Sequence, residues 1–219
     1  MVTDEQDGDC CSDPRELDIA GDCHVTLRLR ALSAHLSETW MAKRIEVESL
    51  GLEHLVAALE TEDVLGAVLR AQLQVEQQLE LFLVANVADG MWDVASSLPQ
   101  NFSQKVAMAA ALGFPKELCF AATAINQIRN KFAHKSGWAL KQADIDNLVE
   151  KYDAARAAVD PASYDVRQSY IQLHGLGGEK ISFGTKGPEW DFKMVSGWTV
   201  SLILKYMVMK NSENGFGTP

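Results

Sequence analysis

One segment of the chain gathers side chains that can transfer protons and bind anions. Residues 124–134 read Ala-Ile-Asn-Gln-Ile-Arg-Asn-Lys-Phe-Ala-His. In a helix, which turns by about 100° per residue, Asn126, Asn130 and His134 lie on successive turns and form one polar line. Histidine titrates close to neutral pH and serves as a general acid or base, and arginine carries a fixed positive charge. This segment is therefore the first candidate for a functional site.

Arg129 falls at the edge of the apolar face of the same helix. An arginine in that place needs a partner, because burying an unpaired charge costs several kcal/mol. On the long helix expected at residues 61–88, Glu76 lies about 20° from Leu65 and therefore inside a stripe of apolar residues. We predict that the two helices pack through these faces and that Glu76 pairs with Arg129, which holds the guanidinium beside the histidine.

Helices must position these groups. Between residues 15 and 98 the chain has no proline, and its apolar residues recur mostly at the helical spacing. The run Thr-Glu-Asp at residues 61–63 is predicted to cap the long helix. Its apolar stripe consists of Leu65, Val68, Leu69, Val75, Leu79, Phe82 and Leu83. The other helices are expected at residues 25–48, 103–113, 115–137, 141–159 and 191–210.

The region before the last helix has a different character. Five glycines crowd residues 164–188, and residues 170–174 and 180–183 are expected to form a small β-hairpin. Residues 25–29 alternate apolar and polar side chains, so the first segment is compatible with a strand as well as with a helix. The predicted fold class is all-α, an antiparallel helical bundle with a glycine-rich insertion before its last helix.

The negative charge of the chain is concentrated near its start. The formal net charge is −10, and the first 22 residues, with eight acids and one base, account for −7 of it, which leaves −3 for the rest. Residues 1–22 are too charged and too poor in apolar side chains to offset the entropy of ordering, so they are predicted to be disordered. Residues 23–210 are expected to form one helical domain, followed by a flexible tail at 211–219.

No targeting or membrane-spanning segment is expected, and the predicted location is the cytoplasm. The first residues are acidic, and the longest apolar stretch, residues 198–209, contains Lys205 and is too short to span a bilayer. Four cysteines in 219 residues do not make a disulfide framework. The set nearest to a zinc site has no finger or ribbon spacing: Cys10, Cys11, Cys23 and His24. No metal and no cofactor are expected.

Two runs carry a resemblance to a known family. Residues 102–113, Phe-Ser-Gln-Lys-Val-Ala-Met-Ala-Ala-Ala-Leu-Gly, are followed by residues 125–134, which end in Phe-Ala-His. Together they resemble the mannitol operon repressor family and, more broadly, the HEPN superfamily of helical domains. The resemblance covers about residues 61–159, less than half of the chain. An Arg-Asn pair followed after three more residues by His is similar to the HEPN ribonuclease motif.

The resemblance implies a small antiparallel bundle that is often dimeric, with two copies of the motif facing each other across the interface. Active members are metal-independent endoribonucleases. In such an enzyme Arg129, Asn130 and His134 are catalytic. Glu76 supports the arginine, and Asn126 extends the polar face. The histidine would move the 2′-hydroxyl proton, and the arginine would stabilise the phosphorane.

The same residues also have a structural interpretation. Arg129 is then one half of a buried pair. His134 and Lys135 complement the negative end of the helix dipole, and Gly137 ends the helix. Both interpretations stay open at this point.

The choice of function depends on what the surroundings of the motif can bind. Residues 103–113 and 115–137 superficially form a helix-turn-helix, but residues 115–120, which would read the bases, are largely apolar, so direct DNA binding is not expected. Lys131 and Lys135 are isolated cations rather than a basic run, which disfavours RNA. We predict a cytoplasmic regulatory or protein-interaction module, a homodimer with an unidentified protein partner. The alternative is a metal-independent HEPN-type endoribonuclease that acts on RNA.

Overall fold

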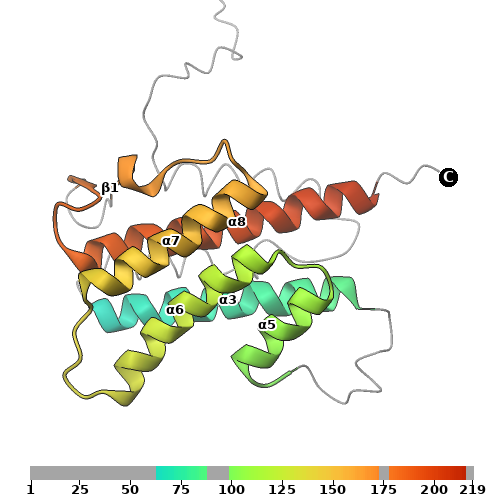
Figure 1. Cartoon of the computed structure of the whole chain (residues 1–219), viewed down its shortest axis with the longest axis horizontal. Coiled ribbons are helices and arrows are strands. Elements are labelled where there is room, and N and C mark those ends of the chain that lie inside the picture. Colours follow the sequence, from blue (N-terminus) through green and yellow to red (C-terminus); the bar gives the residue numbers. More distant parts are fainter. Residues whose placement is uncertain (1–62, 88–98, 173–177, 216–219) are drawn as a thin grey trace, which may run out of the picture.

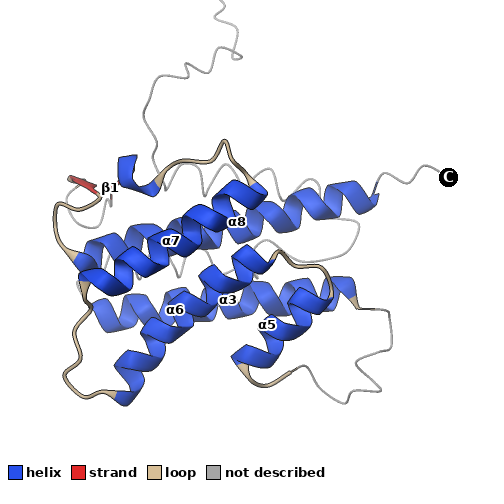
Figure 2. Cartoon of the chain, in the orientation of Figure 1, coloured by secondary structure: helices blue, strands red, loops and turns tan. Residues whose placement is uncertain are grey.

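The structure is a computed structural model that describes residues 63–87, 99–172 and 178–215. The described residues are mostly helical, which confirms the all-α prediction (Figures 1 and 2). The predictions for the acidic segment 1–22, the helix at 25–48 and the cysteine and histidine set at 10–24 lie outside the described residues and stay predictions.

The described helices match the predicted ones in number and order between residues 99 and 215. The elements are helices α3 (Val64–Asn86), α5 (Phe102–Ala111), α6 (Lys116–His134) and α7 (Gln142–Val159), the 3-10 helix η3 (Val166–Gln168), strands β1 (Tyr170–Gln172) and β2 (Lys180–Ser182), and helix α8 (Pro188–Gly215). Helix α8 extends beyond the predicted 191–210 at both ends. Not one helix in the described part of the chain combines the length and the apolar content that crossing a bilayer requires.

The N-cap of helix α3 lies within the predicted capping run. Asp63, the last residue of the run 61–63, is the N-cap, and the Asp63 carboxylate accepts hydrogen bonds from the backbone N–H groups of Leu65 and Gly66, each at 3.0 Å. A carboxylate there also meets the positive end of the helix dipole, which a threonine hydroxyl does not exploit. A Cβ on Gly66 would lie 2.8 Å from the Asp63 carboxylate, so a larger residue at this position would require the capping side chain to shift.

The helices pack around one core. Helices α3 and α8 lie side by side along the long axis of the molecule, α6 packs across α3, and α7 packs on both α6 and α8 (Figure 1). Helix α5 packs on α3. The buried side chains that hold these elements together include Val75, Leu79, Phe82, Leu118, Ile125, Ile145, Leu148, Tyr152 and Ile203. Burying each such side chain is worth about 1.5–3 kcal/mol, so the core fixes the inner face of α6.

The last helix holds the turn between α5 and α6. Gly113 has a φ of 89°, a left-handed conformation that glycine adopts without strain. The Tyr206 hydroxyl donates a hydrogen bond to the Gly113 carbonyl at 3.0 Å, and the Lys210 ammonium donates one to the Leu112 carbonyl at 3.4 Å. Lys210 therefore also meets the negative end of the α5 dipole. Helix α8 in this way holds the turn that precedes α6.

The predicted hairpin is present. Strands β1 and β2 are antiparallel, and Ile171 lies opposite Ile181. Both isoleucines are buried, so one face of the hairpin packs on the core.

A buried carboxylate joins the end of the hairpin to α8. Asp191 lies in the first turn of α8 and is 1% exposed. Its Oδ1 accepts a hydrogen bond from the Gly184 N–H at 2.7 Å, and its Oδ2 is buried without a hydrogen-bond partner. Burial raises the pKa of Asp191, the Gly184 hydrogen bond opposes the rise, and the charge of Asp146 adds to it. Folding therefore favours the protonated carboxyl.

The substitution Asp191→Asn should remove one source of pH-dependent stability. Because the folded state has the higher pKa, it binds more protons than the unfolded chain once the pH exceeds about 4. The free energy of unfolding therefore falls as the pH rises toward the folded-state pKa. Asparagine keeps the acceptor for Gly184 and carries no charge, so the variant should lack this fall and be at least as stable as wild type at neutral pH.

Urea unfolding measured from mildly acidic to neutral pH checks this expectation. Glu150→Gln is the control, because the Glu150 side chain is 71% exposed. This substitution should leave the change of the unfolding free energy with pH as it is in wild type. An Asp191→Asn variant that keeps the wild-type slope and is less stable at neutral pH would show that the carboxylate is charged and stabilising.

Candidate functional site

Helix α6 carries the predicted polar line and brings it to one end of the molecule. Asn126 and Asn130 are half-buried, and His134, the last residue of α6, is exposed. Gly137, the predicted terminator, has a φ of 70° just after the helix ends. The helical core beneath α6 fixes the positions of these groups, while the imidazole itself stands at the surface.

Arg129 contacts its neighbour in the motif rather than a carboxylate. Its Nη1 donates a hydrogen bond to Asn130 Oδ1 at 3.1 Å. Its Nε is buried and has no hydrogen-bond partner. Among the residues that the structure describes, no acid forms an ion pair with Arg129. The positive charge on this part of α6 is therefore uncompensated.

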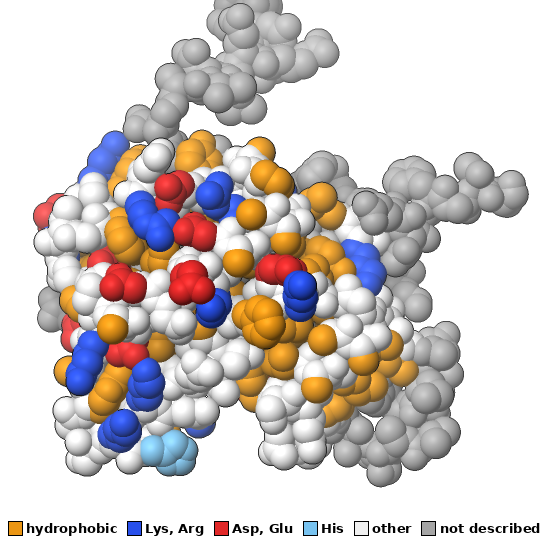
Figure 3. All heavy atoms as spheres, in the orientation of Figure 1, with side chains coloured by type: hydrophobic (Ala, Val, Ile, Leu, Met, Phe, Trp, Pro, Cys, Tyr) orange, Lys and Arg blue, Asp and Glu red, His pale blue; other side chains and the backbone are white. Residues whose placement is uncertain are grey.

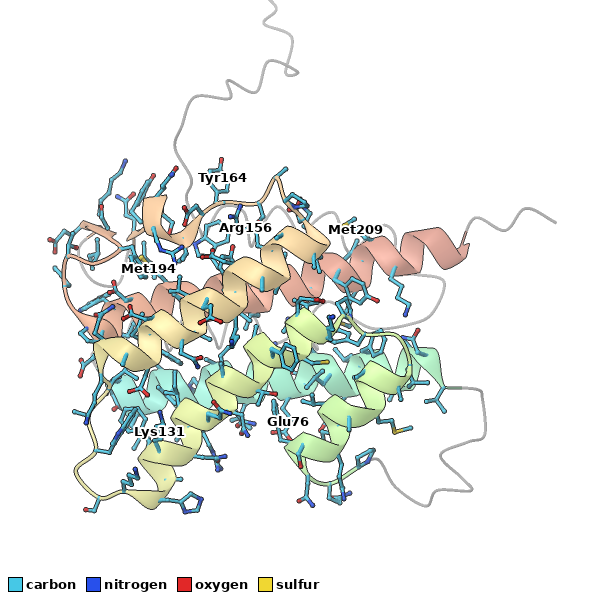
Figure 4. The ribbon with its side chains drawn as sticks, in the orientation of Figure 1. Glu76, Lys131, Arg156, Tyr164, Met194 and Met209 are labelled. Carbon is cyan, nitrogen blue, oxygen red and sulfur yellow. The ribbon has the colours of Figure 1, made fainter. Side chains whose placement is uncertain are left out.

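The predicted pair of Glu76 with Arg129 is not formed, and the structure corrects it. Glu76 binds the Lys105 ammonium at 2.5 Å and accepts a hydrogen bond from the Gln72 amide at 2.6 Å. Lys105 also binds Glu80 at 2.5 Å. Figure 4 shows Glu76 in the space between α5 and α6, with Lys131 farther along α6. One lysine of α5 thus holds two carboxylates of α3.

The physical reason lies in the orientation of α3. The prediction centred its apolar stripe on Leu65, which is 42% exposed. The buried face also contains small and amide side chains that a count of large apolar residues passes over: Ala67, Ala71, Gln72, Gln74 and Gln78. They move the centre of the buried face by roughly 90°, so Glu76 lies at its edge and reaches α5.

Lys105 is the site residue that the sequence analysis missed. It is 6% exposed and lies on the face of α5 that also carries the buried Ala109. Burial lowers the pKa of Lys105, but the hydrogen bonds and charges of Glu76 and Glu80 outweigh this effect and leave the pKa raised, so the ammonium stays charged. The spacing of four between Lys105 and Ala109 was the available signal, because it places both residues on one face of the helix.

Neither a reactive thiol nor a metal-binding cluster is present among the described residues near α6. Burial raises the pKa of Cys119 to about 11, so its thiol stays protonated and is a poor nucleophile. Across residues 63–87, 99–172 and 178–215, no three His, Cys, Asp or Glu side chains gather as a metal site requires.

Helix α6 also presents a line of exposed side chains, which we call the α6 outer face: Lys116, Phe120, Gln127 and His134. These four positions lie within about 40° of one another around the helix. Phe120 is 56% exposed. One aromatic ring surrounded by polar groups is the composition typical of a small protein interface, with an apolar centre and a polar rim.

No protein-family model, curated protein or solved structure matches this chain. The resemblance to the mannitol operon repressor family and the HEPN superfamily therefore remains a prediction from the residues of α5 and α6. The geometry of α6 is the basis for assigning a function.

Replacing Lys105 should destabilise the protein strongly. Removing one partner of a buried ion pair costs about 3–5 kcal/mol. The side chains of Glu76 and Glu80 are 21% and 39% exposed, so water recovers part of that cost. We expect Lys105→Ala to lower the free energy of unfolding by about 2–3 kcal/mol.

Lys116→Ala is the matched control, because the Lys116 side chain is 77% exposed. Its effect in the same urea unfolding experiment should stay within about 0.5 kcal/mol. Equal losses from the two substitutions would show that Lys105 is not part of a buried cluster.

Proposed function

We propose that the protein is a regulatory, protein-interaction module of the mannitol operon repressor type, and that it forms a homodimer through the α6 outer face. The observation that carries this proposal is Phe120, an aromatic ring that is 56% exposed on a helix whose other side is fixed in the core. Fully burying such a side chain is worth about 1.5–3 kcal/mol. Covering the ring with a partner surface therefore stabilises the complex. In a symmetric dimer two Phe120 rings are covered.

The arrangement of the α6 outer face suits two-fold symmetry. Gln127 lies midway between Phe120 and His134 in the sequence. In a two-fold dimer the same patch of each subunit meets itself, so a line of residues along one helix can serve both copies. Gln127 and His134 then supply the polar rim around the aromatic anchor.

Regulation in this proposal acts through protein contacts and not through the reading of bases. A recognition helix presents its N-terminal residues to the edges of base pairs. In α6 this part of the helix contributes Leu118 and Cys119 to the core, where they are 0% and 5% exposed. These side chains are committed to packing, which supports a protein partner over DNA.

A cysteine in the middle of the α6 outer face tests the dimer. The three cysteines other than Cys119 are first changed to serine: Cys10, Cys11 and Cys23. In that background Gln127→Cys should form a disulfide-linked dimer under mild oxidation, because the two-fold contact brings the two thiols together. Cys119 stays unreactive, since it is buried and its pKa is raised.

Two further variants make the result decisive. Ala154→Cys, at an exposed position of α7, is the matched control and should not cross-link. Phe120→Asp should abolish the cross-link at Gln127→Cys and yield a monomer in sedimentation experiments. A cross-link of equal yield from positions 127 and 154, or from neither, contradicts the proposed dimer.

Arg129 supports a second candidate function, a metal-independent endoribonuclease of the HEPN type. Its guanidinium has no carboxylate partner within the described residues and is hydrogen-bonded to Asn130. His134 is exposed at the end of the same helix. A free cation and an accessible imidazole suit phosphoryl chemistry. Glu76, which the motif assigns to the arginine, is bound to Lys105 instead, so this candidate stands second.

The substitution His134→Ala separates the two functions. A histidine at a helix end contributes at most about 2 kcal/mol through the helix dipole, so the variant should stay folded. An interaction module leaves single-stranded RNA intact whether His134 is present or not. Cleavage by the wild type in EDTA, lost in a folded His134→Ala variant, would establish the nuclease and displace the first proposal.

A further inference from the structure

The end of the molecule where α6 passes into α7 is basic, in a chain that is acidic as a whole. Between Glu117 and Asp144 the sequence has no acid, and it holds four Lys and Arg residues and one histidine, while the whole chain carries −10. Figure 3 shows blue and pale-blue side chains gathered at this end. We call this surface the basic end, and its members are Arg129, Lys131, Lys135 and Lys141.

Most of the charge of the basic end is not neutralised by the described part of the protein. Lys131 forms an ion pair with Asp144, whose side chain is 10% exposed. Asp144 also accepts a hydrogen bond from the backbone N–H of Lys141 at 3.2 Å, so this acid is already occupied. Lys135 and Lys141 have exposed side chains and form no ion pair with any described residue.

The loop that carries these lysines is held in place by aromatic contacts. The Trp138 ring packs edge-on against Phe132 with the ring centres 4.6 Å apart, and the Lys131 ammonium lies 5.8 Å from the centre of the Trp138 ring. Leu140 is buried in the core. Lys135 and Lys141 therefore stand on either side of a fixed segment, which lowers the entropic cost of binding a ligand there.

We propose that the basic end binds a short segment of a partner protein that is rich in Asp and Glu. This inference rests on the proposed function, because it takes the protein to act by binding other proteins, and it adds the chemistry of the partner. Carboxylates form charge-assisted hydrogen bonds with lysine and arginine. Complementary charges of this kind also raise the rate of association and select the partner.

The charge balance favours an acidic peptide over RNA. Sequence-independent affinity for nucleic acid grows with the number of phosphates that Lys and Arg neutralise, and the basic end offers few cations on a chain of −10. At physiological salt the Debye length is about 8 Å. A ligand confined to the basic end is therefore screened from the acidic remainder of the protein, whereas a long polyanion meets its repulsion.

The test measures binding of three labelled probes to the full chain by fluorescence anisotropy: an octaglutamate peptide, an octaglutamine peptide and a long polyuridine RNA. We expect octaglutamate to bind, octaglutamine not to bind, and the RNA to bind at least about tenfold more weakly than octaglutamate. Binding of octaglutamate should weaken as salt is raised, because the contacts lie at the surface.

Charge reversal locates the site. Lys135→Glu combined with Lys141→Glu should weaken octaglutamate binding by at least about tenfold, because two attractive contacts become repulsive. Lys151→Glu combined with Lys186→Glu changes the net charge equally at lysines that are already ion-paired, and it should change binding by less than about twofold.

Three results overturn the inference: no binding of octaglutamate, unchanged binding by the Lys135 and Lys141 variant, or RNA binding as tight as that of octaglutamate. The cross-link from Gln127→Cys, measured in parallel, distinguishes this failure from failure of the proposed dimer. A normal cross-link without octaglutamate binding refutes the acidic partner alone, and octaglutamate binding without a cross-link refutes the dimer alone.

Discussion

The ion cluster of Lys105 with Glu76 and Glu80 determines which charges of this protein stay available for other contacts. Lys105 is 6% exposed and binds both carboxylates at 2.5 Å, so a buried ammonium joins α5 to α3. A lysine buried to this degree is tolerated only with its acids in place. Because the cluster occupies both acids, Arg129 on the neighbouring helix keeps an uncompensated charge.

Helix α6 carries two exposed surfaces, the α6 outer face and the basic end. Its inner face packs in the core, and α8 holds the turn that precedes it through the hydrogen bond from Tyr206 to the Gly113 carbonyl. The α6 outer face leaves Phe120 in water, and the far end of the helix concentrates the cations. Both surfaces therefore stand on a rigid element, which is the condition for a precise binding site. A dimer through one surface and an acidic partner at the other require no change in the fold.

Features set by local sequence could be predicted. Helices α5 and α6 are bounded by Gly113, Pro115 and Gly137, residues that begin or end helices through their own backbone preferences, and the hairpin follows from its glycines. The polar line of α6 follows from the helical repeat alone.

Features set by the packing of distant elements could not be predicted. The partner of Glu76 depends on how α3 is turned toward α5, and the alanines and glutamines on its buried face hide that orientation from a hydrophobic pattern. Residues 191–200 of α8 are all buried, so this part of the helix has no exposed face to reveal its orientation, and its buried Asp191 gave no signal. In both cases the missing information is the position of one helix relative to another.

Double-mutant cycles between Glu76 and its two candidate partners test the central claim most directly. One cycle combines Glu76→Gln with Lys105→Met, the other combines Glu76→Gln with Arg129→Met, and urea unfolding supplies the free energies. The structure predicts a coupling free energy above about 1 kcal/mol for Glu76 with Lys105 and one within about 0.5 kcal/mol of zero for Glu76 with Arg129. A strong coupling of Glu76 with Arg129 and none with Lys105 would contradict the account.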